Sequence, residues 1–581
     1  MNAVQQLLTD HIDMWTAADT GKKSGRGRAS SNASSVYGVR KLRELILELA
    51  VRGKLVPQDT TEKPASELLK RIHAEKAKLI TEGKIKNDKP LPPITEEEKP
   101  FELAHGWEWI RLNELLRKIG AGSTPLGGKQ VYLNEGIPFL RSQNVWDEGL
   151  RLDDVAFISP ETHLKMSGTH ICAGDLLFNI TGASIGRCAI VPESFGTGNV
   201  SQHVTIVRSV SKELLQFLHL VLISRHVQQT VMDVQVGVSR EGLSIGKLGQ
   251  FIIPIPPLTE QHRIVAKVDE LMALCDQLET QHTNATEAHD KLVSHLLGTL
   301  TQSQSAEDFS ANWQRIATHF DTLFTSEASI DALKQTLLQL AVMGKLVPQD
   351  PKDEPASELL KCIQAEKAKL IAEGKIKKDK TLPQISDEQK PFDLPQGWEW
   401  VRFAEISTIK GELVRSEYFQ DCRQVAPDCI EKGTGRLTEF RTVKESGIRG
   451  PNSRFYKGQI VYSKIRPSLS KAVLVDFDGL CSADMYPIDA FIDPEFLLKQ
   501  ILSEFFLEQV RIAENRIKMP KLNQESLTAF VLPLPPLSEQ VRIVAKLNKL
   551  VALSDQLKVR IREANQLQQK LADVMVQKAV V

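Results

Sequence analysis

The stretch GKLVPQD at residues 53–59 returns unchanged at residues 344–350. The offset of 291 residues between the two copies holds without a gap from about Leu42 to beyond Trp109. It preserves PASELLK, AEKAKLI, EGKIK, KPF and GWEW. Identity over such a length does not arise by chance, so one structural unit is predicted to occur twice in the chain.

A second repeat follows each copy of the first at a different offset. PPLTEQHRIVAKVDELMALCDQLE (256–279) matches PPLSEQVRIVAKLNKLVALSDQLK (535–558) at an offset of 279, so the second of two unlike inserts is about 12 residues shorter than the first. The chain therefore divides into a tail (1–36), a first helical region (37–104), a first insert (105–253), a central helical region (254–395), a second insert (396–532) and a C-terminal helix (533–581).

Both copies of the second repeat predict a long helix. Thr259 and Ser538 closely follow prolines and are the predicted N-caps. Apolar residues then recur at spacings of four and three, a heptad seam suited to packing against another helix. The seam positions are Ile264, Val268, Leu271, Cys275 and Leu278 in the first copy and Ile543, Leu547, Leu550, Ser554, Leu557 and Ile561 in the second.

The first repeat begins with a helical pattern. After GKLVPQD, a second and highly charged helix is predicted to end at Gly83 in one copy and Gly374 in the other. A proline-rich crossing then leads into each insert. In the tail, the spacing of Val4, Leu7, Leu8, Ile12 and Trp15 suggests a short docking helix, with a flexible tail as the alternative, and residues 21–35 are typical of a disordered basic linker.

The inserts differ from the repeats in residue composition and pattern. Short β-branched runs bounded by Gly, Pro and Asn, such as GIPFLRSQNV, HVTIVRS and GQIVYSKIRPSLSKAVLVDFDG, predict strands joined by turns. KELLQFLHLVLISRHVQQTV predicts a helix or two in the first insert. Each insert is long enough to form a domain of ordinary size.

Composition narrows the class of protein. No run of 18 apolar residues occurs, so no membrane span is predicted. The N-terminus lacks the basic flank and apolar core of a signal peptide, and the 7 cysteines include no CxxC pair. These features favour a cytoplasmic protein with reduced thiols and no zinc site. The formal net charge of +0 neither supports nor excludes a nucleic-acid partner.

Catalytic motifs are missing from the sequence. There is no Walker A loop, no H-E-x-x-H and no Asn/Asp-Pro-Pro-aromatic methyltransferase motif. GASIG (182–186) and GLSIG (242–246) match G-x-S-x-G, but strand-like runs follow them, which favours glycine-rich loops. All 13 histidines lie at or before His319, so a duplicated histidine-dependent active site is excluded.

The second insert contains a biased basic run. Between Ser446 and Val475 it has six basic residues and no acidic one, with tyrosines and small polar residues interleaved. Such a face suits phosphate contacts by Lys and Arg and base-edge contacts by Arg and Asn. The alternative is a solvated basic face whose acidic partners come from elsewhere in the fold.

The first insert offers two polar clusters, at 141–144 and at 199–203, and a basic loop precedes the last strand of each insert. Side chains of these types can read bases or hold phosphates. The candidate DNA-contacting residues are Arg141, Gln143, Asn144, Gln202, Arg240 and Lys247 in the first insert and Arg449, Arg454, Lys464, Arg466, Lys471, Lys518 and Lys521 in the second.

Several of these segments together resemble one protein family. They are EKPFELAHGWEWIRL and KPFDLPQGWEWVRF at the starts of the inserts, GAGSTP, GIPFLRSQNV and GDLLFNITGASIG in the first, GQIVYSKIRPSLS in the second, and the PPLTEQ and PPLSEQ helices. In this order, and in two sets, they resemble the specificity (S) subunits of Type I restriction–modification systems. The resemblance covers about residues 37–575. One departure is IKGELVRSEYF, which replaces the GAGSTP turn in the second insert.

The resemblance implies an α/β (α+β) fold. Two globular target-recognition domains would be separated by long antiparallel helices in a pseudo-twofold, circular arrangement. Each domain would read one half of a bipartite, asymmetric double-stranded DNA target, and the helices would set the spacing of the halves.

The resemblance also implies partners. The helices would dock two modification subunits, which methylate adenine with S-adenosylmethionine, and two restriction subunits would join them, with ATP and Mg²⁺ bound on partner subunits. This chain would bind no cofactor or metal and have no catalytic centre. Two other classes remain open: a fused nuclease or methyltransferase, and a coiled-coil scaffold with two domains for ligands other than DNA.

Overall fold

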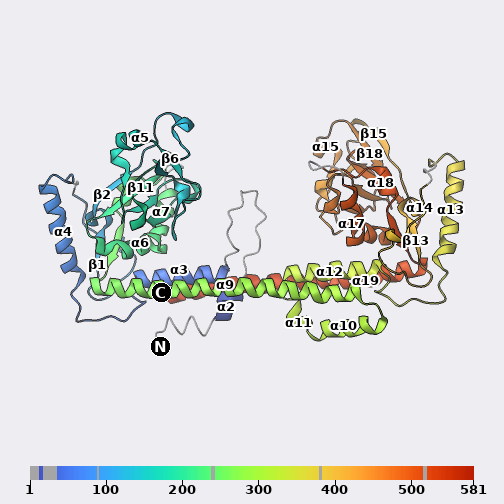
Figure 1. Ribbon diagram of the computed structural model, residues 1–581, viewed down its shortest axis with the longest axis horizontal. Coiled ribbons are helices and arrows are strands. Elements are labelled where there is room, and N and C mark those ends of the chain that lie inside the picture. Colours follow the sequence, from blue (N-terminus) through green and yellow to red (C-terminus); the bar gives the residue numbers. More distant parts are fainter. Residues whose placement is uncertain are drawn as a thin grey trace. The chain divides into compact units, whose positions relative to one another are not determined.

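The computed structural model describes residues 12–17, 36–87, 90–236, 242–377, 382–514 and 520–580. The chain forms two compact units, Met1–Ala285 with Ala564–Val581 (unit 1) and Thr286–Glu563 (unit 2). Each unit combines helices with β-sheets (Figure 1), which confirms the predicted α/β (α+β) class.

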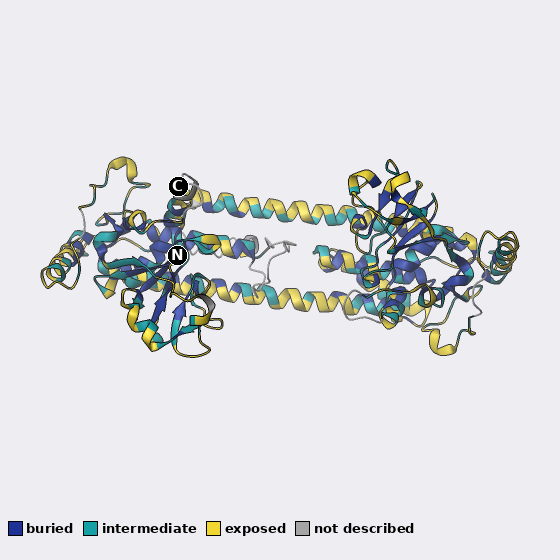
Figure 2. Ribbon diagram, turned by 90° about the horizontal axis from the view of Figure 1, so that it is seen from above, coloured by how far each residue is buried: buried dark blue, intermediate teal, exposed yellow. Residues whose placement is uncertain are grey.

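The helical part of unit 1 is built on the predicted heptad seam. Helix α3 (Tyr37–Val51) lies beside the first part of α9 (Leu258–Gln302), and Arg43 binds Asp276 and Glu279 across the pair. The seam side chains are buried, while residues between them on the long helices are exposed (Figure 2). The buried seam consists of Leu42, Leu45, Leu49, Ile264, Val268, Leu271, Cys275 and Leu278.

The two ends of the chain meet inside unit 1. The last turns of α19 (Leu537–Val580) bury Ala572 and Val576 in the core that contains α3. The Tyr37 hydroxyl donates to the Asp573 carboxylate at 2.8 Å, and Lys41 lies 3.5 Å from the same group. The N-terminal and C-terminal repeats therefore meet, as the circular arrangement implied by the family resemblance requires.

Unit 2 uses the end of α9 in the same way. At the offset of 279, Val293 and Leu297 of α9 correspond to Ala572 and Val576 of α19. Both are buried in the core that contains α12 (Glu327–Val342). Helices α10 (Ala306–Thr318) and α11 (Phe320–Leu323) precede α12.

Helix α12 also pairs with α19 through charged side chains. Lys558 of α19 lies 2.6 Å from the Asp331 carboxylate, and Arg562 lies 2.7 Å from Glu327. The repeat positions of Arg43 and Asp276 are occupied in unit 2 by Lys334 of α12 and Asp555 of α19, which lie 2.7 Å apart, so the second copy of the repeat builds the same kind of helix pair as the first.

A buried hydrogen-bond network explains why the repeated motifs occur together in both copies. In unit 1 the Glu260 carboxylate, near the start of α9, accepts hydrogen bonds from Gln58 Nε2 of GKLVPQD at 2.6 Å and from Trp107 Nε1 of GWEW at 3.0 Å. Gly53 has a φ of +67°, and a Cβ there would approach Ala104 to 2.8 Å. The three motifs therefore meet in one place, and we call the group of Gln58, Trp107 and Glu260 the joint of unit 1.

The same joint is present in unit 2. The Glu539 carboxylate accepts from Gln349 Nε2 at 3.2 Å and from Trp398 Nε1 at 2.9 Å. Burial raises the pKa of Glu260 and of Glu539, and the hydrogen bonds act in the opposite direction.

The predicted N-caps Thr259 and Ser538 are wrong. Helix α9 begins at Leu258 and α19 at Leu537, so both residues lie inside the first turn. The helices start earlier because the Pro257 carbonyl already accepts from the amide of Gln261 at 2.9 Å.

A two-stranded ribbon closes each insert at its base. In unit 1, β1 (Glu108–Arg111) pairs antiparallel with β12 (Ile252–Ile255), and in unit 2, β13 (Glu399–Arg402) pairs with β23 (Val531–Leu534). The start and end of each insert are thus tied together next to the joint, and the insert forms its own domain above it.

The first insert contains two main sheets. One has the strand order β2-β11-β8-β9 and is antiparallel, and the other has the order β6-β3-β10-β7 with β3 and β10 parallel. The strands are β2 (Leu116–Ala121), β3 (Ile137–Leu140), β6 (Ala156–Ile158), β7 (His170–Ile171), β8 (Leu176–Asn179), β9 (Cys188–Ile190), β10 (Gly198–Val200) and β11 (Val204–Ser209). Helices α6 (Leu215–Ile223) and α7 (Arg225–Val236) follow.

The second insert repeats this topology with a different sequence and with one additional edge strand, β15. Its sheets have the orders β14-β22-β19-β20 and β15-β18-β21-β16-β17, with β16 and β21 parallel. The strands are β14 (Ser407–Ile409), β15 (Glu412–Arg415), β16 (Arg423–Val425), β17 (Arg441–Thr442), β18 (Pro451–Phe455), β19 (Ile460–Ser463), β20 (Ala472–Leu474), β21 (Gly479–Cys481) and β22 (Met485–Ala490). Helices α16 (Pro494–Leu502) and α17 (Glu504–Ala513) follow.

The charged helices of the first repeat are α4 (Ala65–Thr81) and α13 (Ala356–Ala372). Gly83 and Gly374 follow them in the left-handed conformation, with φ of +69° and +70°, as predicted for glycine caps. In the tail, α2 (Ile12–Ala17) buries Trp15 against α3, which supports the docking helix. Val4, Leu7, Leu8 and the linker at 21–35 lie outside the described residues.

Candidate nucleic-acid interface

The polar clusters of the first domain come together at one edge. The Asn179 side chain, at the end of β8, donates to the Ser142 carbonyl at 2.8 Å, and the Ile180 amide donates to the His203 carbonyl at 3.0 Å. The amide of Ser201 donates to the Leu140 carbonyl at 2.9 Å. Two clusters that are far apart in the sequence therefore belong to a single surface.

Arg141 and Gln143 share an acidic neighbour on this edge. The Arg141 guanidinium donates to the backbone carbonyl of Asp154 at 3.0 Å, and Gln143 Nε2 donates to the Asp154 carboxylate at 2.6 Å. Asp154 is 85% exposed, and its carbonyl and carboxylate occupy donors of both side chains.

Asn144 and Gln202 differ sharply in exposure. Asn144 is 2% exposed, and its amide donates to the carbonyls of Arg151 and Asp154 while its oxygen accepts from the Arg141 amide. It shapes the loop and is not open to a base. Gln202 is exposed in the turn between β10 and β11, next to His203, whose Nδ1 lies 2.7 Å from the Thr181 hydroxyl.

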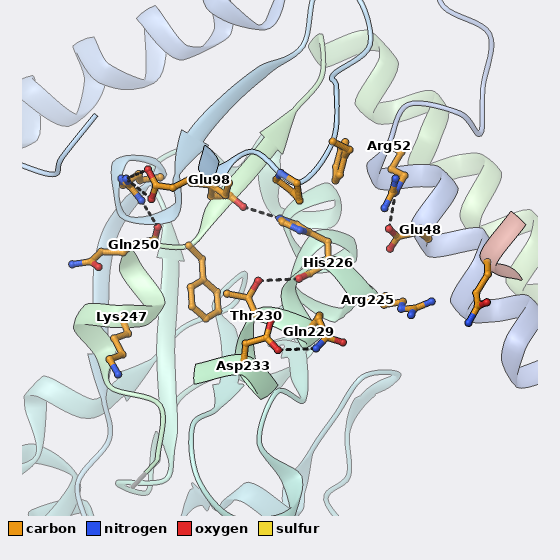
Figure 3. Close-up of a pocket in the computed structure, with 16 residues that line it drawn as sticks. Glu48, Arg52, Glu98, Arg225, His226, Gln229, Thr230, Asp233, Lys247 and Gln250 are labelled. Carbon is orange, nitrogen blue, oxygen red and sulfur yellow. Dashed lines mark hydrogen bonds and ion pairs between the residues drawn. The ribbon is translucent and has the colours of Figure 1, made fainter. Parts of the chain in front are cut away.

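Lys247 lies on α8 (Ile245–Gly249), beside a pocket of about 790 Å³. Figure 3 shows Lys247 at one side of this pocket and Glu48 at the other, with Asp233 between them. Basic and acidic side chains alternate around the pocket, which does not favour a phosphodiester. The predicted Arg240 lies outside the described residues.

The basic loops of the two domains occupy matching places. In unit 2 the Leu522 amide donates to the Lys464 carbonyl at 2.9 Å, and in unit 1 the Leu243 amide donates to the Ile180 carbonyl at 2.8 Å. Each loop before the last strand thus pairs with the segment that follows the central strand, β8 or β19. The predicted Lys518 lies outside the described residues.

Arg466 and Lys521 are adjacent at this place in unit 2. The Arg466 amide donates to the Pro520 carbonyl at 2.9 Å, and Ile465 and Lys521 form a β-bridge. Arg466 is exposed with a φ of +45°, a conformation that only a well-supported loop holds. Lys521 Nζ lies 3.1 Å from the Asp484 carboxylate.

The rest of the basic run has mixed surroundings. The Arg454 guanidinium lies 5.4 Å from the Phe419 ring and 5.0 Å from the Tyr456 ring, and Lys464 Nζ lies 5.3 Å from the Tyr486 ring. Arg449 is exposed just before β18. Lys471 instead donates to the carbonyl of Pro427, so this side chain supports the domain interior.

The GASIG motif forms a local turn in the first domain. Ser184 of GASIG lies in a 3₁₀ turn, where its hydroxyl accepts from Asn179 at 3.2 Å. Within the described ranges, no group of three or more His, Cys, Asp or Glu side chains is placed to hold a metal ion. The chemistry available at these edges is hydrogen bonding, charge and aromatic stacking.

Comparison with known proteins assigns the family. The model of the "Type I restriction modification DNA specificity domain" matches residues 104–288 and 395–566, which are the two inserts and the helices that follow them. The chain belongs to the Type I restriction–modification specificity subunits. This confirms the resemblance drawn from the repeated motifs.

Two curated relatives match the specificity subunit over its full length. The Type I restriction enzyme EcoAI specificity subunit of Escherichia coli is 40% identical over 609 residues, and the EcoEI specificity subunit of the same species is 39% identical over 610 residues. Both alignments cover 100% of this chain and 100% of the relative.

Solved structures give a weaker match. The HsdS subunit from Thermoanaerobacter tengcongensis is 18% identical, and the alignment covers 83% of this specificity subunit and 98% of that chain with a TM-score of 0.40. The family assignment therefore rests on sequence. In the part of the specificity subunit that the structure describes, no helix has the length and apolar character needed to cross a membrane.

Proposed function

We propose that this specificity subunit reads a bipartite, asymmetric DNA target, with one recognition domain for each half. The proposal rests on one observation: the two recognition domains share a strand topology but differ in the side chains of the corresponding loops. The loop after the central strand contains Ile180 and Thr181 in the first domain but Lys464 and Ile465 in the second. Two domains with the same sheet topology but different loop side chains are suited to reading two different half-sequences.

The repeated helices serve assembly in this proposal. They offer the same surfaces twice, which suits two copies of the same modification subunit, and two restriction subunits complete the complex. Helices α9 and α19 set the spacing between the half-sites. Exposed apolar side chains on α19 supply docking contacts for a partner: Leu553, Val559, Leu567 and Leu571.

The chemistry of methylation and cleavage belongs to the partners. S-adenosylmethionine, ATP and Mg²⁺ bind there, and this chain binds no cofactor and catalyses no reaction. It acts in the cytoplasm, where its DNA is. A coiled-coil scaffold for other ligands is the competing function, and it predicts no salt-dependent DNA binding.

Single-molecule sequencing of genomic DNA tests the proposal. Cells with and without this gene are compared, each also carrying the gene for the modification subunit. Methyladenine on a bipartite asymmetric motif should appear only when both genes are present. An unchanged methylation map, together with purified complex that binds DNA equally well at low and high salt, would overturn the proposal.

A further inference from the structure

Trp146 is held between two arginines in the first recognition domain. It ends β4 (Val145–Trp146), and the guanidinium carbons of Arg151 and Arg187 lie 3.5 Å and 3.6 Å from its ring centroid. Because two cations on one face at these distances would collide, the indole separates them. We call Trp146, Arg151 and Arg187 the arginine clamp.

The clamp is fixed in place by its surroundings. Trp146 Nε1 donates to the Gln143 carbonyl at 2.8 Å, which joins the clamp to the polar cluster at 141–144. The Arg187 carbonyl accepts from the Asn179 amide at 2.8 Å. Before Arg187, Gly186 has a φ of +90°, and its carbonyl accepts from Gln228 Nε2 at 2.9 Å. The guanidinium groups are therefore pre-organised before any ligand arrives.

Neither guanidinium of the clamp has a hydrogen bond or ion pair to another described residue. Arg208 of the same domain, by contrast, donates to both oxygens of the Asp175 carboxylate. Stacking occupies the face of a guanidinium and leaves the N–H groups along its edge free. Those N–H groups match the O6 and N7 acceptors of guanine in the major groove.

Carboxylates near the arginine clamp determine whether it favours a phosphate or a base edge. The carboxylate of Asp147 accepts from the Cys188 amide at 3.0 Å and interacts electrostatically with Arg187. Glu148 and Asp154 are exposed nearby. Acidic groups around the clamp repel phosphates, so its donors suit a base edge better than the DNA backbone.

We propose that the arginine clamp reads a guanine in the half-site of the first recognition domain. This inference rests on the proposed function and adds residues that the sequence patterns did not indicate. The second domain has Lys471 at the position of Arg187, and Lys471 bonds to the Pro427 carbonyl instead. The clamp therefore belongs to one half-site only.

The test uses the full chain assembled with its modification subunit on DNA libraries randomised at each position of the target. Arg187→Ala should reduce discrimination at one position of one half-site by roughly 5- to 150-fold and leave the other half-site unchanged. Arg187→Lys keeps the positive charge but loses the paired N–H donors of the guanidinium, so it should reduce base discrimination at the same position. Arg117→Ala, an exposed arginine on β2, is the control of equal charge and should keep the full motif.

The outcomes separate this proposal from the one it rests on. If the wild-type complex modifies no bipartite motif, the proposed function fails. If the wild type has such a motif and both Arg187 variants keep it intact, or lose affinity equally for every sequence, the clamp does not read a base. Should Arg187→Ala fail to fold, as judged by circular dichroism, Arg187→Lys decides the matter alone.

Discussion

Replacing Glu260 by alanine should loosen unit 1 and leave unit 2 intact. The substitution removes the only hydrogen-bond partner that the described residues offer the Trp107 indole N–H, and it removes one of two for Gln58, which also donates to the Gly53 carbonyl at 3.1 Å. An orphaned buried donor costs about 1–3 kcal/mol, and the lost second bond about 1 kcal/mol. Removing a desolvated carboxylate returns about 1 kcal/mol. The net loss is about 1–3 kcal/mol.

Hydrogen–deuterium exchange of the full chain measures this loss where it arises. Amides of β1 and β12 should exchange roughly 5- to 150-fold faster in Glu260→Ala, since about 1.36 kcal/mol corresponds to a factor of ten. Glu260→Gln keeps an oxygen for the indole but turns an amide nitrogen toward Gln58 Nε2, so it loses one bond of about 1 kcal/mol and should accelerate exchange only about fivefold. Glu539→Ala should show the mirror result, with faster exchange in β13 and β23.

Either of two results would contradict this role of the Glu260 carboxylate. Equal acceleration by Glu260→Ala and Glu260→Gln would mean that the charge, rather than the acceptor, holds the joint together. Equal effects of one variant on both ribbons would mean that the joint does not stabilise its own unit.

Other consequences can be measured in parallel. Because burial raises the pKa of Glu260 and Glu539 above the ordinary 4.5, the folded chain binds their protons more tightly than the unfolded chain, and stability should fall as pH rises through the raised values. Thermal unfolding across this range should show a weaker fall in the Glu260→Gln, Glu539→Gln double variant. Val576→Asp should place an unpaired carboxylate in the core of unit 1 and destabilise that unit by several kcal/mol, about 3 or more, which protease sensitivity of unit 1 against unit 2 reports. Arg466→Ala and Lys521→Ala should each lower the salt dependence of DNA binding by about one counterion if they contact phosphates, and binding titrations at several salt concentrations would contradict this if the slope stays unchanged. Lengthening α9 and α19 by a helical turn should change the spacer of the methylated motif but neither half-sequence, and an unaltered motif in the sequenced genome would contradict the proposed ruler.

The sequence by itself determined the architecture of this protein at the level of its repeats. The identity of GKLVPQD, GWEW and the PPLTEQ helices, together with their heptad spacing, predicted which residues form the buried seam, because periodicity along a helix is a local property that a sequence displays directly. The circular arrangement implied by the family resemblance requires the chain ends to meet, and the hydrogen bond between Tyr37 and Asp573 confirms that they do.

Only the tertiary structure decided what the polar residues do. Asn144 and Gln202 look alike as candidates in the sequence, yet one is buried in its own loop and the other is exposed. Trp146 and Arg187 come from separate parts of the chain, and no local pattern places one on the other. A side chain in a loop takes its partners from distant parts of the chain, so its role depends on how the sheets bring those parts together.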